Sequence, residues 1–395
     1  MKLFGGVAAS AKGGALHAVW TFPAIVGGAF MIAWAAESAQ FFISQGLSLA
    51  ILAWVQTLPE FAVEAVIAWR APHTPNGIHL VSANFTGAVR LLVGLGWPMI
   101  YATAAFFHRR KHRRPMGSIH LEPEHSVEVV GLLAGVAYFT VVAVKGSLSV
   151  WDGVVLMVIY AAYMFILQKI PPQELESPEE EEWPIRQIVV MPPRRRTFTI
   201  AALFLGGALV IYLSVEPFLN SLLAMALSLG VSQYVFVQWI APFLSEFPEK
   251  LSAFYWARKI TGAPMALMNM VSSNINQWTM LAAMIPFVYA LSAGHVEAIP
   301  FDREQRIEIF LTLAQSAFGV CLLANMTLAW HEAVVLFGLF AAQFFIPSLR
   351  EEVTFLYVAW VAYEVLRWLM GWEKPRAFTE FARLFRARIL KRGGA

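Results

Sequence analysis

A short polar pattern occurs twice within strongly apolar sequence, and this duplication constrains the fold more than any other feature of the chain. One copy, Gln-Thr-Leu-Pro-Glu, ends at Glu60, and the other, Ser-Glu-Phe-Pro-Glu, ends at Glu249. An asparagine follows each copy, Asn84 after 24 residues and Asn274 after 25 residues. Carboxylates within hydrocarbon are costly, so a duplicated pair indicates a substrate site. Duplicated, interrupted apolar segments are typical of secondary transporters, and the pattern therefore predicts an ion transporter.

The composition agrees with a membrane protein. Of the 395 residues, 58% are hydrophobic and only 14% are charged, which is more apolar than a soluble domain. The single cysteine, Cys321, excludes an internal disulfide framework and a multi-cysteine metal site. The first apolar run begins after Lys12 without an evident cleavage site, so we expect a retained helix. The charge pattern gives no reason to expect a nucleic-acid partner.

Eleven segments are apolar and long enough to cross a bilayer, which takes about 20 residues. We predict transmembrane helices at about 15–36, 40–70, 78–107, 126–145, 149–169, 198–215, 218–257, 262–292, 304–327, 330–347 and 351–372. The second and seventh are too long for one straight crossing, and in each a proline directly precedes the duplicated glutamate. Proline removes a backbone hydrogen bond, so we predict that these helices break beside Glu60 and Glu249.

The duplication extends beyond the polar pattern. Residues 151–165 align without gaps with 331–345, which places Asp152 opposite Glu332. The first five predicted helices are therefore repeated as the next five, and the eleventh is an addition. Because five is an odd number, the repeats must cross the bilayer in opposite senses. We predict an all-α membrane protein with about 11 transmembrane helices, in two inverted five-helix repeats plus one extra C-terminal helix.

The division of the chain follows from these repeats. We assign residues 1–169 to the first repeat, 170–197 to an acidic linker, 198–347 to the second repeat, and 348–395 to the extra helix and a basic tail. The linker holds a run of acids from Glu174 to Glu182, and we expect it to be solvated and disordered because like charges repel.

Basic residues predict the orientation. Their clusters follow the third helix, precede the sixth, separate the seventh from the eighth and fill the tail, so all lie on one side if there are eleven helices. Positive charge favours the cytoplasmic side. We expect an outside N-terminus with a cytoplasmic linker and C-terminus, in the plasma membrane. Residues 374–392 predict an amphipathic helix on the anionic leaflet of the lipid bilayer.

Glu60 and Glu249 are the leading candidates for binding a hard cation. Oxygen ligands suit Ca²⁺, Na⁺ or Mg²⁺, whereas the lack of paired Cys or His argues against zinc or copper. The alternative is that both glutamates neutralise buried basic residues or face water at helix ends, and their duplication argues against it.

The two copies resemble the cation/Ca²⁺ exchanger superfamily, most closely its sodium/calcium exchanger branch. The repeats of that branch read approximately G-T-S-L-P-E and, about two dozen residues later, G-S-N-I-F-N. Residues 56–60 and 245–249 match the first part, and 82–85 and 272–275 match the second. The resemblance implies ten core helices in two inverted repeats. It also implies alternating-access antiport, in which Ca²⁺ and Na⁺ compete for overlapping ligands.

The resemblance also implies the site. Its second, third, seventh and eighth helices form it, and Glu60 and Glu249 match the calcium-ligating glutamates of the family. We add the polar residues that match or adjoin the other family positions: Glu246, Thr57, Ser245, Asn84, Ser272, Ser273, Asn274 and Gln277. The expected ligands are transported Ca²⁺ and Na⁺ or H⁺, without a resident cofactor.

Two charged residues depart from the family pattern. Glu64 and Arg90 in the first repeat stand opposite Ala253 and Met280 in the second. We predict that Arg90 pairs with Glu64 or Glu60, because an unpaired guanidinium at that depth is costly. As a hypothesis, its charge would occupy the space of a Na⁺ and change ion selectivity. The alternative is that Arg90 lies near a membrane face and reaches water.

We therefore predict a secondary-active antiporter that exchanges Ca²⁺ for Na⁺, and no enzyme activity. A Na⁺/H⁺ or other monovalent cation antiporter is the runner-up, because the altered ligands weaken the case for Ca²⁺. A passive channel is less favoured, because midplane carboxylates suit tight binding. An intramembrane metal-dependent hydrolase is also less favoured, because the sequence has no HExxH-like cluster. The oligomeric state stays open.

Overall fold

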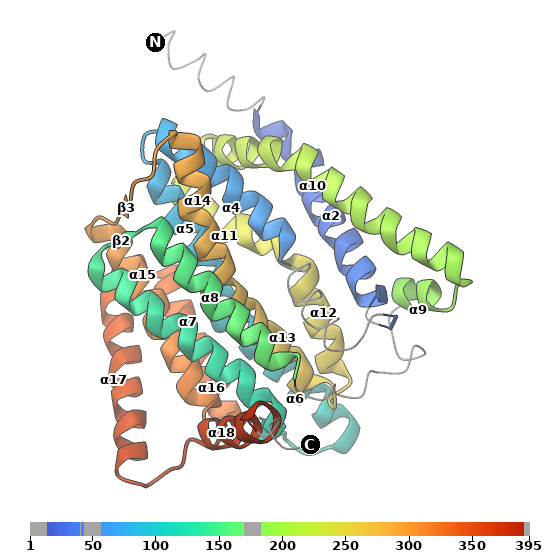
Figure 1. Cartoon of the computed structure of the whole chain (residues 1–395), viewed down its shortest axis with the longest axis vertical. Coiled ribbons are helices and arrows are strands. Elements are labelled where there is room, and N and C mark those ends of the chain that lie inside the picture. Colours follow the sequence, from blue (N-terminus) through green and yellow to red (C-terminus); the bar gives the residue numbers. More distant parts are fainter. Residues whose placement is uncertain (1–13, 40, 43–56, 170–182, 391–395) are drawn as a thin grey trace. The chain divides into compact units, whose positions relative to one another are not determined.

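The computed structural model describes residues 14–39, 41–42, 57–169 and 183–390 (Figure 1). The chain forms two units, each built from both halves of the sequence. Unit 1 holds Met1–Asn84 and Pro171–Glu249, and unit 2 holds Phe85–Ile170 and Lys250–Ala395. The helices α5 (Gly77–Leu91) and α12 (Phe247–Arg258) continue from unit 1 into unit 2.

Unit 1 is helical in its described part. Apart from the beginnings of α5 and α12, its elements are α2 (Ala18–Ala39), α4 (Leu58–Arg70), the 3₁₀ turn η1 (Ala71–His73), α9 (Trp183–Val189), α10 (Pro193–Leu229) and α11 (Gln233–Ser245). Helix α2 packs along α10, and α4 packs against α2, α10 and α11.

Small and hydroxylated residues allow α2 and α10 to approach closely. A Cβ atom added at Gly28 would lie 2.8 Å from Ile211, and one added at Gly207 would lie 2.7 Å from the Gly28 carbonyl oxygen. The buried hydroxyls of Thr21 and Ser221 form a hydrogen bond of 2.8 Å between the same helices. Without a hydrophobic drive between helices in lipid, such contacts are the usual basis of transmembrane packing.

Two predicted boundaries in this unit were wrong. Helix α10 does not end at residue 215 but continues through Pro217 to Leu229, and it ends where Gly230 adopts φ +66°. Glycine takes this left-handed conformation without a Cβ clash, so it stops the helix where the proline does not. The linker is also not wholly irregular, because α9 buries Ile185 and Ile188 and packs on α2 and α10. The acidic run of the linker lies outside the described residues.

The predicted break in the seventh helix is confirmed. Helix α11 ends at Ser245 and α12 begins at Phe247, so the break lies at Glu246, three residues before Glu249. In the first repeat, α4 begins at Leu58, two residues before Glu60. The first part of the predicted helix 40–70 lies mostly outside the described residues.

Unit 2 contains the remaining elements. Its helices are α6 (Trp97–His112), α7 (Ser126–Lys145), α8 (Val150–Leu167), α13 (Ala263–Asn276), α14 (Ala282–Ala293), α15 (Arg303–Leu323), α16 (Trp330–Phe345), α17 (Arg350–Leu369) and α18 (Arg376–Arg388). Two π-helical segments, η2 (Leu92–Gly96) and η4 (Gln277–Leu281), interrupt the third and eighth predicted helices. Two 3₁₀ turns, η3 (Pro123–His125) and η5 (Pro347–Leu349), precede α7 and α17.

In unit 2, two short antiparallel sheets each pair a strand of the first repeat with a strand of the second. Strand β1 (Ser118–His120) pairs with β4 (Thr327–Ala329), and β2 (Ser147–Leu148) pairs with β3 (Ile299–Pro300). Helix α7 leads from β1 to β2, whereas α15 leads from β3 to β4. The two helices pack together, and because β1 pairs with β4 and β2 with β3, they run in opposite directions.

The helix starts confirm the sequence alignment of Asp152 with Glu332. The Asp152 carboxylate accepts a hydrogen bond of 2.7 Å from the backbone N–H of Ser149, just before α8. The Glu332 carboxylate accepts one of 2.7 Å from the backbone N–H of Ala329, just before α16. Each acid therefore satisfies a backbone donor at the start of its helix.

The helices have the lengths and compositions of membrane spans. Six described helical segments are long and apolar enough to cross a membrane: 14–39, 77–112, 123–145, 150–167, 193–229 and 303–323. The chain is a multi-pass integral membrane protein. The tail residues Arg376–Arg388 form the predicted helix, α18, which packs on α7 and η3.

Candidate functional site

The duplicated glutamates occupy matching local positions in unit 1. Glu60 lies in the first turn of α4 and Glu249 in the first turn of α12, each directly after a proline. Their relative exposures are only 2% and 4%. The N-terminal end of a helix carries partial positive charge, which favours a carboxylate in its ionised form. A proline at the start of a helix removes an N–H that has no intrahelical partner, so the sequence favours these starts.

A second carboxylate pairs with the first-repeat asparagine. Glu64 lies one turn after Glu60 on α4 and is fully buried. Its Oε2 accepts a hydrogen bond of 2.6 Å from Nδ2 of Asn84 on α5. Its Oε1 and the Oδ1 of Asn84 are both buried without a hydrogen-bond partner in the described part of the chain. The pair thus keeps two acceptor oxygens open to a cation or a proton.

The other predicted ligands of unit 1 are buried near the two helix starts. Thr57, Ser245 and Glu246 are exposed by 2%, 2% and 3%. Thr57 directly precedes α4, and Glu246 lies at the break between α11 and α12. The hydroxyl of Ser245 donates to the carbonyl of Ala241 at 3.1 Å, so its oxygen lone pairs remain available to a ligand.

The predicted ligands of unit 2 lie on α13 and at the start of η4. Asn274 and Gln277 are fully buried, and Nδ2 of Asn274 donates to Oε1 of Gln277 at 3.3 Å. Ser273, which directly precedes Asn274 in the sequence, is also buried, with an exposure of 2%. The hydroxyl of Ser272 contacts the Tyr163 hydroxyl on α8 at 3.2 Å.

The two repeat-related asparagines share one chemical feature. In each, the amide nitrogen donates to a side-chain oxygen, which is Glu64 for Asn84 and Gln277 for Asn274. In each, the carbonyl oxygen Oδ1 is buried and has no hydrogen-bond partner among the described residues. Such an oxygen costs free energy unless a ligand or ordered water satisfies it. Amide oxygens are ligands that Ca²⁺ accepts.

Arg90 has a partner that the sequence reasoning missed. Its Nη2 lies 2.5 Å from Oε2 of Glu308 on α15, and its Nη1 donates to Gln343 on α16 at 2.9 Å. Arg350, at the start of α17, pairs with the other carboxylate oxygen of Glu308. Glu64, one of the two partners predicted for Arg90, is bonded to Asn84.

The alternative position for Arg90, near a membrane face with access to water, was wrong, because Arg90 is fully buried. The sequence offered one signal for the missed partner. A glutamate embedded in an apolar helix requires compensation, and Glu308 is such a residue.

No three His, Cys, Asp or Glu side chains of the described residues are grouped so that they could hold a metal ion. Besides carboxylates, the predicted set offers the amide oxygens of Asn84, Asn274 and Gln277 and the hydroxyl oxygens of Thr57, Ser245, Ser272 and Ser273.

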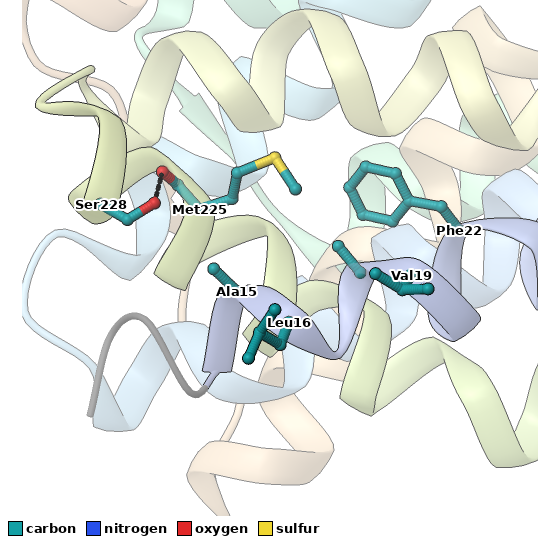
Figure 2. A pocket seen from close by; sticks show the side chains of 7 residues that line it. Ala15, Leu16, Val19, Phe22, Met225 and Ser228 are labelled. Atoms are coloured by element: carbon teal, nitrogen blue, oxygen red, sulfur yellow. Dashed lines mark hydrogen bonds between the residues drawn. The ribbon is translucent and has the colours of Figure 1, made fainter. Parts of the chain in front are cut away.

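None of these residues lines the apolar groove found in unit 1. It has a volume of about 570 Å³ between the start of α2 and the end of α10 (Figure 2). Its lining consists of Ala15, Leu16, Ala18, Val19, Phe22, Met225 and Ser228. The Ser228 hydroxyl is already bonded to the Met225 carbonyl at 2.9 Å. The groove offers hydrocarbon contacts and does not suit a cation.

Comparison with known proteins connects these features to one group of transporters. A family model described as sodium/calcium exchanger protein matches residues 14–169 and 199–348. The crystal structure of an H⁺/Ca²⁺ exchanger, CAX, is similar with 30% identity and a TM-score of 0.87, over 96% of this chain and 92% of that chain.

Structures of the sodium-calcium exchanger NCX_Mj are similar at lower identity. With 100 mM Na⁺ and 10 mM Sr²⁺, the match has 17% identity and a TM-score of 0.53, over 85% of this chain and 98% of that chain. With 2.5 mM Na⁺ and 1 mM Sr²⁺, it has 17% identity and a TM-score of 0.53, over 86% and 97%. No curated protein sequence matches the chain significantly.

Proposed function

Since the chain belongs to the sodium/calcium exchanger protein family, we propose that it is a secondary-active antiporter that exchanges Ca²⁺ for a monovalent cation. The observation that carries the proposal is the burial of Glu60 and Glu249 in matching first turns of α4 and α12. Two carboxylates neutralise one divalent cation, which offsets the cost of placing either charge in a low-dielectric interior.

The remaining ligands in this proposal are neutral oxygens and the carboxylate of Glu246. Ca²⁺ takes 6–8 oxygen ligands at about 2.3–2.6 Å, so two glutamates cannot complete its coordination. The partnerless Oδ1 atoms of Asn84 and Asn274 support a role for both amides. The other polar members of the predicted ligand set are Thr57, Ser245, Glu246, Ser272, Ser273 and Gln277.

We favour H⁺ over Na⁺ as the counter-ion. The neighbour that is 30% identical over 96% of the chain is described as an H⁺/Ca²⁺ exchanger. The sodium-calcium exchanger neighbour is only 17% identical, so its likeness concerns the fold. Na⁺, the counter-ion expected from the sequence motifs, is the second candidate because the description of the family names sodium.

Inverted repeats and eleven spans are also part of the proposal. The opposite directions of α7 and α15 between the two small sheets support the inversion. A bound cation would then be exposed to each side of the membrane alternately, as one repeat rocks against the other around the fixed site. The cytoplasmic C-terminus, the plasma membrane location and contact of α18 with anionic lipid follow from the basic clusters.

The proposal can be tested by ⁴⁵Ca²⁺ uptake into proteoliposomes with an outward gradient of H⁺, Na⁺ or K⁺. We expect the H⁺ gradient to drive uptake, and we expect Glu60→Gln and Glu249→Gln to reduce it to the level of protein-free liposomes. Glu304→Gln is the matched control, because it makes the same chemical change at an exposed position on α15 and should transport like the wild type.

The outcomes separate the parts of the proposal. Uptake driven by Na⁺ alone would replace H⁺ with the second candidate. Absence of Ca²⁺ uptake under every gradient would refute Ca²⁺ exchange, and uptake that survives both substitutions would refute the assignment of the two glutamates.

A further inference from the structure

Unit 2 contains a buried carboxylate that the proposed calcium site does not use. Glu128 lies on α7 with an exposure of 9%. Its Oε2 is buried and has no hydrogen-bond partner among the described residues. An ionised carboxylate in such surroundings is costly, whereas a protonated one is neutral. The position thus favours a group that binds a proton.

The repeat relates Glu128 to Glu308. Residues 121–153 align with 301–333 without gaps, which places Glu128 opposite Glu308. The structure repeats the hydrogen bonds at both ends of this alignment. The Leu121 N–H donates to the Met326 carbonyl, and the equivalent Phe301 N–H donates to the Gly146 carbonyl, both at 2.9 Å. The two glutamates therefore occupy equivalent positions in the two repeats.

Among the residues that the structure describes, only one of these equivalent carboxylates has basic partners. Glu308 pairs with Arg90 and Arg350. The residue equivalent to Arg90 in the second repeat is Met280, and Arg350 lies on the helix that follows the repeats. The chain therefore compensates Glu308 with two guanidinium groups, while the same position in the first repeat receives neither.

The groups around Glu128 do not replace these arginines. The groups that interact with it electrostatically are Glu124, four residues earlier in η3, and the Tyr163 hydroxyl on α8. Helix α13 and η4, which also pack on α7, contain no titratable residue.

Four elements that contact α7 carry further charged or titratable groups: α8 adds Asp152 and η3 adds His125, and α15 and α18 carry several charges each. On α15 these are Arg303, Glu304, Arg306 and Glu308, and on α18 they are Arg376, Glu380, Arg383, Arg386 and Arg388. None of them forms an ion pair with Glu128 in the described part of the chain. A like charge beside a carboxylate disfavours its ionised form.

We propose that Glu128 is a proton-binding site that couples H⁺ movement to cation exchange. The inference rests on the proposed Ca²⁺/H⁺ function and assigns the proton a site apart from Glu60 and Glu249. The step is a simple protonation, in which the carboxylate takes a proton from water on one side of the membrane and the acid returns it to water on the other. We assign Glu308 no such role, because Arg90 and Arg350 both pair with its carboxylate.

Two substitutions test the site with the full-length protein in proteoliposomes. Glu128→Gln removes the titratable group and keeps its size, whereas Met280→Arg supplies the guanidinium that the other repeat provides through Arg90. For both variants we expect loss of H⁺-driven ⁴⁵Ca²⁺ uptake and retention of Ca²⁺/Ca²⁺ exchange, which needs no net proton movement. Glu128→Asp should keep H⁺-driven uptake with a shifted pH profile, and Glu124→Gln is the matched control that should keep the coupling.

The result distinguishes this inference from the proposed function. If the wild type shows no Ca²⁺/H⁺ exchange, the proposed function itself fails. If the wild type exchanges and Glu128→Gln retains H⁺-driven uptake at the wild-type rate, the proton site is refuted. Loss of Ca²⁺/Ca²⁺ exchange in a folded, monodisperse Glu128→Gln protein would also refute it, because Glu128 would then serve the cation or the fold.

Discussion

The buried arginine–glutamate cluster makes a quantitative prediction about stability. Arg90 is fully buried and Glu308 is exposed by only 3%. Removing one partner of a buried ion pair costs about 3–5 kcal/mol, because the other charge stays desolvated. In Arg90→Met, however, Glu308 keeps Arg350, so we expect the lower end, about 3 kcal/mol. In Glu308→Gln, Arg90 loses its carboxylate, and we expect about 5 kcal/mol.

The double variant Arg90→Met/Glu308→Gln should cost less than the two single losses together. Once one charge of the pair is gone, removing the other no longer breaks an ion pair, so we expect a coupling energy of about 2 kcal/mol. At about 2 °C per kcal/mol, Arg90→Met should lower the apparent Tm by about 6 °C. The measurement is thermal unfolding of detergent-solubilised protein at one scan rate, since such unfolding is commonly irreversible.

Arg306→Met is the matched control, because Arg306 is an exposed arginine on α15 and its loss should change Tm by less than about 2 °C. If the losses in Arg90→Met and Glu308→Gln simply add in the double variant, the ion pair does not exist as described and the reasoning fails. Ca²⁺ transport by folded Arg90→Met should keep the ion selectivity of the wild type. A changed counter-ion would instead revive the hypothesis that Arg90 takes the place of a Na⁺.

Three further predictions concern helix ends and one loop. Asp152→Asn weakens the contacts of Asp152 with Lys145 and with the start of α8. We expect it to lower the free energy of unfolding by about 1–2 kcal/mol, and an unchanged midpoint in chemical unfolding would contradict this. Gly146→Ala should cost about 1–2 kcal/mol, because Gly146 has φ +77° and open space around its Cβ position; a stabilised variant would show that the backbone there is not left-handed. The hydrogen bond to Glu297, aided by the Ala293 carbonyl, raises the pKa of His295, so this contact stabilises the protonated ring at low pH and is lost as pH rises through the raised pKa. An NMR titration should therefore show a lower His295 pKa in Glu297→Gln, and identical titrations would refute the pairing.

Much of the site was accessible from the sequence because its signals are local. A proline before each duplicated glutamate predicted a helix break beside it, and in the second repeat α11 ends at Ser245 and α12 begins at Phe247. Burial of Glu60 and Glu249 followed from the apolar surroundings of the motif. The matching capping roles of Asp152 and Glu332 followed from the gap-free alignment.

Other features depended on contacts between residues that are far apart in the sequence. The partner of Arg90 lies 218 residues away, and no local pattern distinguishes Glu308 from the nearer acids Glu60 and Glu64. The sequence also did not predict that α10 ends at Gly230 and not at Pro217. A proline inside a membrane helix is tolerated where neighbouring groups satisfy the freed backbone groups.

The sequence by itself determined the family, the duplicated acidic motif and the membrane-spanning character, because these depend on composition, spacing and repetition along the chain. Only the tertiary structure decided which charges are compensated. Glu128 and Glu308 are equivalent in the sequence, yet Arg90 and Arg350 reach only Glu308. The physical reason is that the free energy of a buried charge depends on its neighbours in space, and folding brings those neighbours from helices far apart in the chain.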